Sequence, residues 1–240
     1  MNAAGRVPGE SGNSTTTETV FRSMLQNVQS GKWPVGYAIP SERSLIGDFG
    51  VSRIAVREAL SMLRGLGVLD IGHGRRTLVR KIDSDTFAQL LPLLLASSGQ
   101  ESFDHIFEVR LSLESASARL AATRRNDEQL GSLQKLALKY EEHAMRGSDE
   151  ATSIDLQFHL KVAQASDNPL FPVLLESLSA FVFYVQKESC RDNKVRLQRA
   201  IHAHHAITEA IADKDAERAR VEMEAHLRYS ATRKLQSTLS

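Results

Sequence analysis

The chain has 240 residues, of which 42% are hydrophobic and 25% are charged, a composition typical of a globular protein with one large domain or two small ones. No apolar run approaches the roughly 20 residues of a membrane-spanning helix, and the polar first residues lack the apolar stretch of a signal peptide. The single cysteine excludes an internal disulfide. We therefore expect a cytoplasmic protein without a membrane partner, and a disordered tail at residues 1–13.

Charge is divided unevenly along the chain, although the net charge is only +1. Residues 14–83 hold 10 Lys/Arg and 6 Asp/Glu, whereas residues 84–240 hold 19 Lys/Arg and 22 Asp/Glu. A small basic module is thus joined to a larger, mildly acidic one. This asymmetry indicates an anionic partner for the first module.

Three short helices and a β-hairpin are predicted in the first third by apolar spacing, glycines and turn residues. Their expected bounds are 17–30, 41–50 and 52–65 for the helices, and 68–71 and 77–79 for the strands. Ser41 is expected to cap the second helix. This order of elements is that of a winged helix-turn-helix domain, which we place at residues 14–80.

Basic residues on this module point to double-stranded DNA. Arg53 and Arg57 lie one turn apart on the third helix, so both face one side, as in a helix that enters the major groove. Arg43, at the start of the preceding helix, is expected to contact a backbone phosphate. The tip of the hairpin is expected to enter a minor groove. Each arginine alone is equally well explained as a solvated surface charge. The expected contact set is Arg43, Ser52, Arg53, Arg57, His73 and Gly74.

Helical periodicity continues from residue 84 to the end, with no convincing strand. Seven helices are predicted, at about 84–98, 102–124, 126–147, 149–166, 169–190, 194–213 and 215–234. Short loops favour antiparallel packing of neighbours. The expected fold is therefore mainly α: the winged domain, a linker at 81–85, an all-α antiparallel bundle at 86–234 and a C-terminal tail at 235–240.

Helical phase sorts the histidines of the segment "IHAHHAI". His204 lies on the same stripe as Ile207 and Ile211, so it is expected to point into the bundle. His202 and His205 lie off that stripe and are expected to meet solvent. A buried imidazole requires partners for its nitrogens, so His204 predicts a polar cluster in the interior.

Three further residues share inward faces with His204. Asp155 and His159, four apart in "SIDLQFHLKVAQ", stack on one apolar face, and His226 lies on the apolar stripe of the last predicted helix. Imidazoles and a carboxylate on three helices suit a divalent metal, most simply zinc, but also nickel, manganese or iron. A buried Asp–His hydrogen-bond network without a metal explains the spacing equally well.

Two parts of the sequence resemble known domains. The stretch "IPSERSLIGDFGVSRIAVREALSMLRGLGVL" resembles the signature of GntR-family winged-helix regulators. The stretches "FEVRLSLESASARLAA", "DLQFHLKVAQASDNPLF" and "HHAITEAIADKDAERARVEMEAHL" resemble the FCD effector domain of the FadR-type subfamily. The resemblance implies a homodimeric transcription factor on a palindromic operator, usually a repressor that a small carboxylate metabolite releases.

The resemblance also implies roles for individual residues. Many FCD domains hold a divalent metal through an Asp, a His four residues later and two further His on the last two helices. Those positions here are Asp155, His159, His204 and His226. The arginine of the motif E-x-R-x-x-L-E often meets the effector carboxylate, which implies Arg110; the alternative is a salt bridge to Glu114, four residues on.

The sequence departs from the family at the wing, where Gly-x-Gly-Thr is replaced by Gly74, Arg75, Arg76 and Thr77. Arg76 replaces a flexible residue and thereby changes the wing conformation and its groove contacts, or the added arginines strengthen phosphate binding instead. A metal-dependent enzyme is the alternative from another class, because three His and one Asp are able to hold a catalytic zinc. No H-E-x-x-H motif and no evident general base accompany them, so we expect a regulator and not an enzyme.

Overall fold

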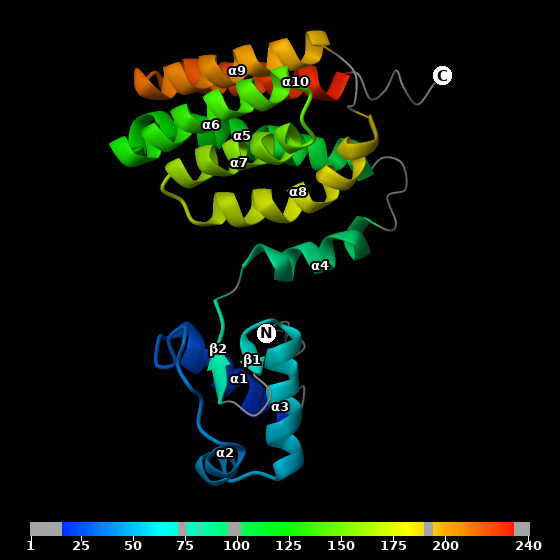
Figure 1. Ribbon diagram of the computed structural model, residues 1–240. Helices are drawn as coiled ribbons and strands as arrows, with labels where there is room; N and C mark the ends of the chain where they lie inside the picture. The colour runs from blue at the N-terminus through cyan, green and yellow to red at the C-terminus, as the bar shows by residue number, and fades with distance from the viewer. Residues whose placement is uncertain (1–15, 72–75, 82, 96–101, 190–193, 233–240) are drawn as a thin grey trace, which may run out of the picture. The chain divides into compact units, whose positions relative to one another are not determined.

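The computed structural model describes residues 16–71, 76–81, 83–95, 102–189 and 194–232 (Figure 1). The chain divides into two compact units, Met1–Ile82 and Asp83–Ser240, and each has its own apolar core. We describe the two units separately. None of the described helices is long and apolar enough to span a bilayer.

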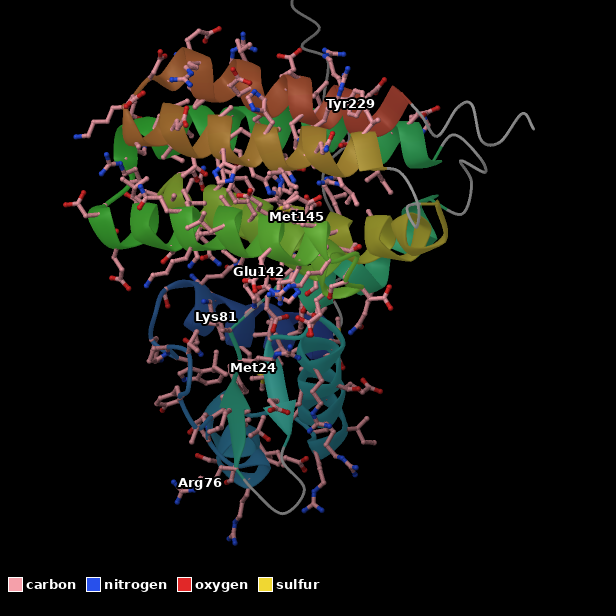
Figure 2. The ribbon with its side chains drawn as sticks, turned by 45° about the horizontal axis from the view of Figure 1, so that its top comes forward. Met24, Arg76, Lys81, Glu142, Met145 and Tyr229 are labelled. Carbon is pink, nitrogen blue, oxygen red and sulfur yellow. The ribbon has the colours of Figure 1, made fainter. Side chains whose placement is uncertain are left out.

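The first unit contains three helices and a two-stranded antiparallel sheet. These are α1 (Thr16–Gln29), α2 (Glu42–Phe49), α3 (Arg53–Gly65), β1 (Leu69–Ile71) and β2 (Thr77–Val79). Leu69 pairs with Val79 and Ile71 with Thr77. The core gathers apolar side chains from every element, among them the fully buried Met24 of α1 (Figure 2). The predicted winged helix-turn-helix fold is confirmed.

Local caps set the ends of α2 and α3. The Ser41 hydroxyl accepts the amide N–H of Ser44, and the Ser52 hydroxyl accepts that of Ala55, each at 3.2 Å. Gly50 ends α2 in the left-handed region, at φ +63°, where its N–H reaches the carbonyl of Ile46. A side chain with a Cβ is strained at this φ, so glycine is the fitting residue in the turn between the two helices.

The second unit contains seven helices among the residues that the structure describes. They are α4 (Ser84–Leu95), α5 (Ser102–Arg124), α6 (Asp127–Met145), α7 (Glu150–Ala165), α8 (Leu170–Ser189), α9 (Lys194–Ala212) and α10 (Ala216–Thr232). They follow the seven predicted segments closely, and the mainly α fold is confirmed. The predicted helix ends at residues 98, 190 and 234 lie outside the described residues. Some helices begin one residue later than predicted, because the predicted first residue is the N-cap. Before α6, for example, Asn126 forms a capping box with Gln129.

Close packing of small residues organises this unit. The helix α5 packs along α10 and also contacts α7, while α6 lies against α7 and α9 (Figure 1). Ala118, Ala121 and Ala122 of α5 are fully buried, as is Ala219 of α10, and such residues let helix axes approach closely. The core between these helices therefore places α7, α9 and α10 around one interior point, beside Phe158.

Candidate metal and effector site

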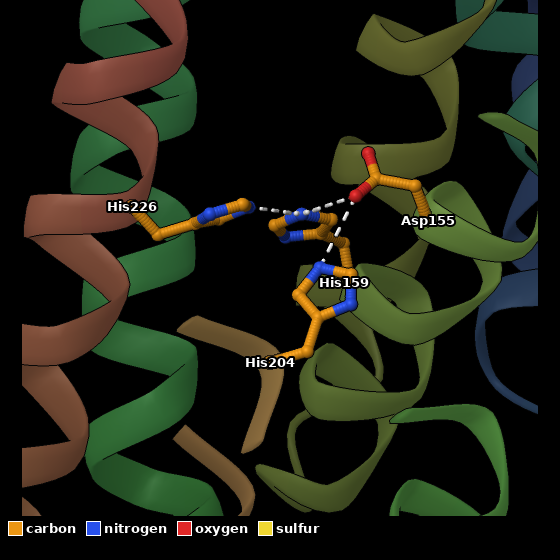
Figure 3. A group of neighbouring side chains, drawn as sticks. All are labelled: Asp155, His159, His204 and His226. Atoms are coloured by element: carbon orange, nitrogen blue, oxygen red, sulfur yellow. Dashed lines mark hydrogen bonds and ion pairs between the residues drawn. The ribbon is translucent and has the colours of Figure 1, made fainter. Parts of the chain in front are cut away.

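Four polar side chains converge in the interior of the helical unit. Asp155 and His159 come from α7, His204 from α9 and His226 from α10, and one nitrogen or oxygen of each lies within 4.8 Å of the others (Figure 3). The three imidazoles are buried, whereas the Asp155 side chain is 25% exposed. The structure thus brings together all four residues that the sequence singled out.

The separations between these atoms suit one small cation. His204 Nε2 lies 3.1 Å from Asp155 Oδ1, and His226 Nε2 lies 3.2 Å from His159 Nε2. His159 Nε2 is 3.9 Å from the same Asp155 oxygen. Tetrahedral ligand atoms about 2.0–2.1 Å from a zinc ion are about 3.3 Å apart. Three imidazole nitrogens and one carboxylate oxygen therefore fit a divalent metal in both chemistry and spacing.

Different neighbours orient the rings of His159 and His204. His159 Nδ1 contacts Glu114 Oε2 at 2.5 Å, on the side of the ring opposite to Nε2. The His204 ring stacks on Phe158 with 4.1 Å between centroids, and Tyr140 lies 4.4 Å away. His204 Nδ1 is buried without a hydrogen-bond partner among the described residues. One ring is thus held by a carboxylate and the other by aromatic packing.

Burial and mutual charge set the protonation of the carboxylates. Burial alone would raise the pKa of Glu114, but the positive charges of Arg110 and His159 outweigh it and lower that pKa to about 2. Burial would likewise raise the pKa of Asp155, yet the hydrogen bond from His204 and the positive charge of His159 lower it. Both carboxylates are therefore ionised at neutral pH.

The histidines differ among themselves. Burial, together with the positive charges of His159 and His204, lowers the pKa of His226 to about 3. Burial also lowers the pKa of His204, although Asp155 opposes this. In His159, burial is outweighed by Glu114, so its pKa is raised. His204 and His226 are therefore neutral at pH 7, which is the form that binds metals.

Arg110 lies on α5 beside this cluster, with its side chain 11% exposed. Its Nε donates to Glu114 Oε1 at 2.7 Å, so the salt bridge that was the alternative to effector binding is present. Because a guanidinium also carries two terminal Nη groups, this bond does not use up its donors. Arg110, Glu114 and His159 form a continuous chain of contacts that ends at the cluster.

The sequence pattern pairs Glu114 only with Arg110 and does not predict its place beside the four clustered residues. Its contact with His159 joins two helices and residues 45 positions apart. One signal was available, because Glu114 precedes the buried Ala118 and Ala121 by four and seven residues and so shares their stripe. The two histidines next to His204 in the sequence do not join the cluster. His202 is exposed, and His205 Nε2 is 2.8 Å from Glu141.

The basic residues of the first unit lie on its surface. Arg53 and Arg57 are exposed on α3, Arg43 is exposed on α2, and Ser52 is the N-cap of α3. Arg57 Nε is 4.0 Å from Glu42, which is a weak surface pairing. The predicted wing contacts at residues 73 and 74 lie outside the described residues, and the exposed Arg76 directly precedes β2 (Figure 2).

Comparison with known proteins agrees with both units. Residues 16–79 match the family described as bacterial regulatory proteins, gntR family, and residues 105–229 match the FCD domain. The chain is 33% identical to the HTH-type transcriptional repressor NanR of Klebsiella aerogenes, over 90% of this chain and 84% of that protein. It is 30% identical to the HTH-type transcriptional regulator LutR of Bacillus subtilis, over 83% and 92%.

A solved structure supports the same conclusion. The structure of Streptococcus agalactiae GntR superimposes with a TM-score of 0.70 at 26% identity and covers 89% of this chain and 98% of that one. The relatives are DNA-binding regulators, and the metal-dependent enzyme alternative is rejected. The chain therefore belongs to the GntR family of bacterial regulatory proteins, as a transcriptional regulator with a winged helix-turn-helix domain and an FCD effector domain.

Proposed function

We propose that this regulator represses transcription as a homodimer on a palindromic operator and leaves it when a small organic acid binds in the helical unit. The observation that carries the proposal is the convergence of Asp155, His159, His204 and His226 beside the Arg110–Glu114 pair. An interior site with cation ligands and an arginine suits an anionic ligand with several oxygens, such as a sugar, hydroxy or keto acid.

The proposed cofactor is a divalent metal, with zinc first and nickel, manganese or iron as alternatives. When bound, the cation supplies positive charge and coordination positions for the oxygens of an acid. Asp155, the one partly exposed member of the four, marks the side from which the acid enters. His204 and His226 are buried and neutral at pH 7, so these two imidazoles offer lone pairs without a cost for removing protons.

Arg110 is the proposed partner for the effector carboxylate. Its Nε remains on Glu114, while a terminal Nη group donates a charge-assisted hydrogen bond to the acid. Closure of the helices around the acid then changes the geometry that the domain imposes on the dimer. The acid must bind the DNA-incompetent state more tightly for release to occur. About 1.4 kcal/mol of coupling lowers DNA affinity tenfold.

On the DNA side, α3 is the proposed recognition helix. Arg53 and Arg57 contact base edges or phosphates in the major groove, and Arg43 contacts the backbone. Two such helices in a dimer meet successive major grooves about 34 Å apart. A dimer whose domains change their separation no longer fits both half-sites.

The test uses untagged protein, so that a histidine tag does not bind metal. Metal content is measured first, and a panel of sugar, hydroxy and keto acids is then screened by thermal shift with and without zinc. We expect one acid class to raise the melting temperature only with zinc, and to release operator DNA in gel shifts. His204→Ala combined with His226→Ala should lose metal and acid response yet keep DNA binding.

His202→Ala is the matched control, because His202 lies exposed on the same helix as His204. It should keep metal, acid response and DNA binding. Stoichiometric metal in the double variant would contradict the ligand assignment. A metal-free Asp–His cluster remains the second candidate, because His204 Nε2 already lies 3.1 Å from Asp155 Oδ1. It predicts no metal in the parent protein and an acid response that chelators do not change.

A further inference from the structure

We propose that Glu114 is a positioning residue that holds His159 in the orientation required for cation binding. The inference rests on the proposed function, because it concerns how the four ligands acquire their affinity. Glu114 lies on α5, whereas the four ligands lie on α7, α9 and α10. It therefore adds a fourth helix to the site without contributing a ligand atom.

The two oxygens of Glu114 have separate partners. Oε1 accepts the Nε–H of Arg110 at 2.7 Å, and Oε2 contacts His159 Nδ1 at 2.5 Å. The carboxylate is 1% exposed, so water does not compete for either oxygen. A charge in this position is tolerated because the Arg110 guanidinium neutralises it from one side and the polar Nδ1 of His159 contacts it from the other.

The contact with Glu114 determines which nitrogen of the His159 ring is directed toward the other three clustered residues. With Nδ1 held by the carboxylate, Nε2 is directed toward Asp155 and His226, which lie 3.9 and 3.2 Å away. A carboxylate behind a metal-binding imidazole selects the Nδ1–H tautomer and makes Nε2 a stronger donor. Loss of such a partner typically weakens metal binding about 10- to 100-fold.

A purely structural role for Glu114 would not account for this division of its oxygens. Pairing with Arg110 alone would neutralise the buried carboxylate, yet the second oxygen is used on a ligand of the cluster. His204 shows the contrast, because its ring stacks on the Phe158 face and it approaches a carboxylate, that of Asp155, through Nε2 and not through Nδ1. The carboxylate also connects the proposed effector contact, Arg110, to the cation site through one side chain.

The test compares Glu114→Gln with Glu108→Gln, an exposed glutamate on the same helix. Glutamine keeps the size of the side chain and removes its charge. Zinc affinity is measured by competition with a chromophoric chelator, and cobalt(II) absorption in the visible range reports the coordination directly. We expect about 10- to 100-fold weaker zinc binding and an altered cobalt spectrum in Glu114→Gln, with parental values in Glu108→Gln.

Urea unfolding of the metal-free proteins separates a folding defect from a binding defect. If Glu114→Gln does not fold, Glu114→Asp decides the question, because it keeps the charge near Arg110 but withdraws the carboxylate from His159 by one methylene. Unchanged zinc affinity in a folded Glu114 variant would overturn the inference and leave the proposed function intact. A parent protein that binds neither zinc nor cobalt would overturn both.

Discussion

Arg125 joins the end of α5 to the end of α9, and its replacement tests how the site helices are held. The side chain is 9% exposed, and its Nη2 donates to the carbonyl of Ala212 at 2.9 Å, while Nε lies 3.5 Å from that of Ile211. Arg125→Met keeps most of the apolar stem and removes these bonds. A charged hydrogen bond contributes about 1.5–3 kcal/mol, and a cation at a helix C-terminus about 0.3–1 kcal/mol.

The ion pair of Arg125 with Asp127 adds little, because Asp127 is fully exposed. We therefore expect Arg125→Met to lower the free energy of unfolding of the helical unit by about 2–4 kcal/mol. With a urea m-value of about 2 kcal/mol per M, the midpoint falls by about 1–2 M. The expected loss is large enough to be seen by circular dichroism, to which the seven described helices of the second unit contribute most of the helical signal.

The single tryptophan provides an internal reference for this experiment. Trp33 is buried in the core of the first unit, so its fluorescence reports the unfolding of that unit and should not move. Arg146→Met is the matched control, because Arg146 is 70% exposed and pairs with Glu142 on the surface. It should change stability by less than about 0.5 kcal/mol. Equal midpoints for the parent and Arg125→Met would refute the assigned role of the contact.

Three further predictions concern the two units separately. Arg53→Ala should weaken operator binding by about 1–3 kcal/mol without lowering stability, because Arg53 is exposed, and an unchanged gel-shift titration would remove it from the contact set. Ser52→Ala removes the cap of α3 and should cost about 1 kcal/mol in unfolding followed by Trp33 fluorescence, whereas an unmoved midpoint would show that the cap contributes nothing. Acid should destabilise the metal-free helical unit. The pKa of His226 is near 6.5 in the unfolded chain and about 3 in the folded one. Between about pH 6.5 and 3 the unfolded state therefore binds the extra proton, and the free energy of unfolding decreases as the pH falls. His226→Asn should flatten that part of the stability profile, and an unaltered profile would contradict the low pKa.

Features that depend on a few neighbouring residues were predictable from the sequence. The caps at Ser41 and Asn126 lie within three residues of the amides they bind, so helix starts followed from local chemistry. The choice of His204 over His202 depended only on helical phase, and the structure places His204 in the interior and His202 on the surface.

Features that depend on how helices cross were not predictable. The contact of Glu114 with His159 and that of Arg125 with Ala212 join helices that are distant in sequence. Their geometry depends on how closely α5 approaches α7, α9 and α10, which the packing of small residues such as Ala118 decides. Periodicity identifies the inward stripe of each helix but does not say which stripes meet.

The order in which the chain is synthesised has a consequence for a cell that makes this regulator. The first unit has a core of its own and ends at Ile82, whereas the last of the four proposed metal ligands, His226, lies on α10, about 145 residues later. At about 5–20 residues per second, translation of that interval takes roughly 7–30 s. A nascent chain therefore folds its DNA-binding unit well before the proposed metal and effector site is complete.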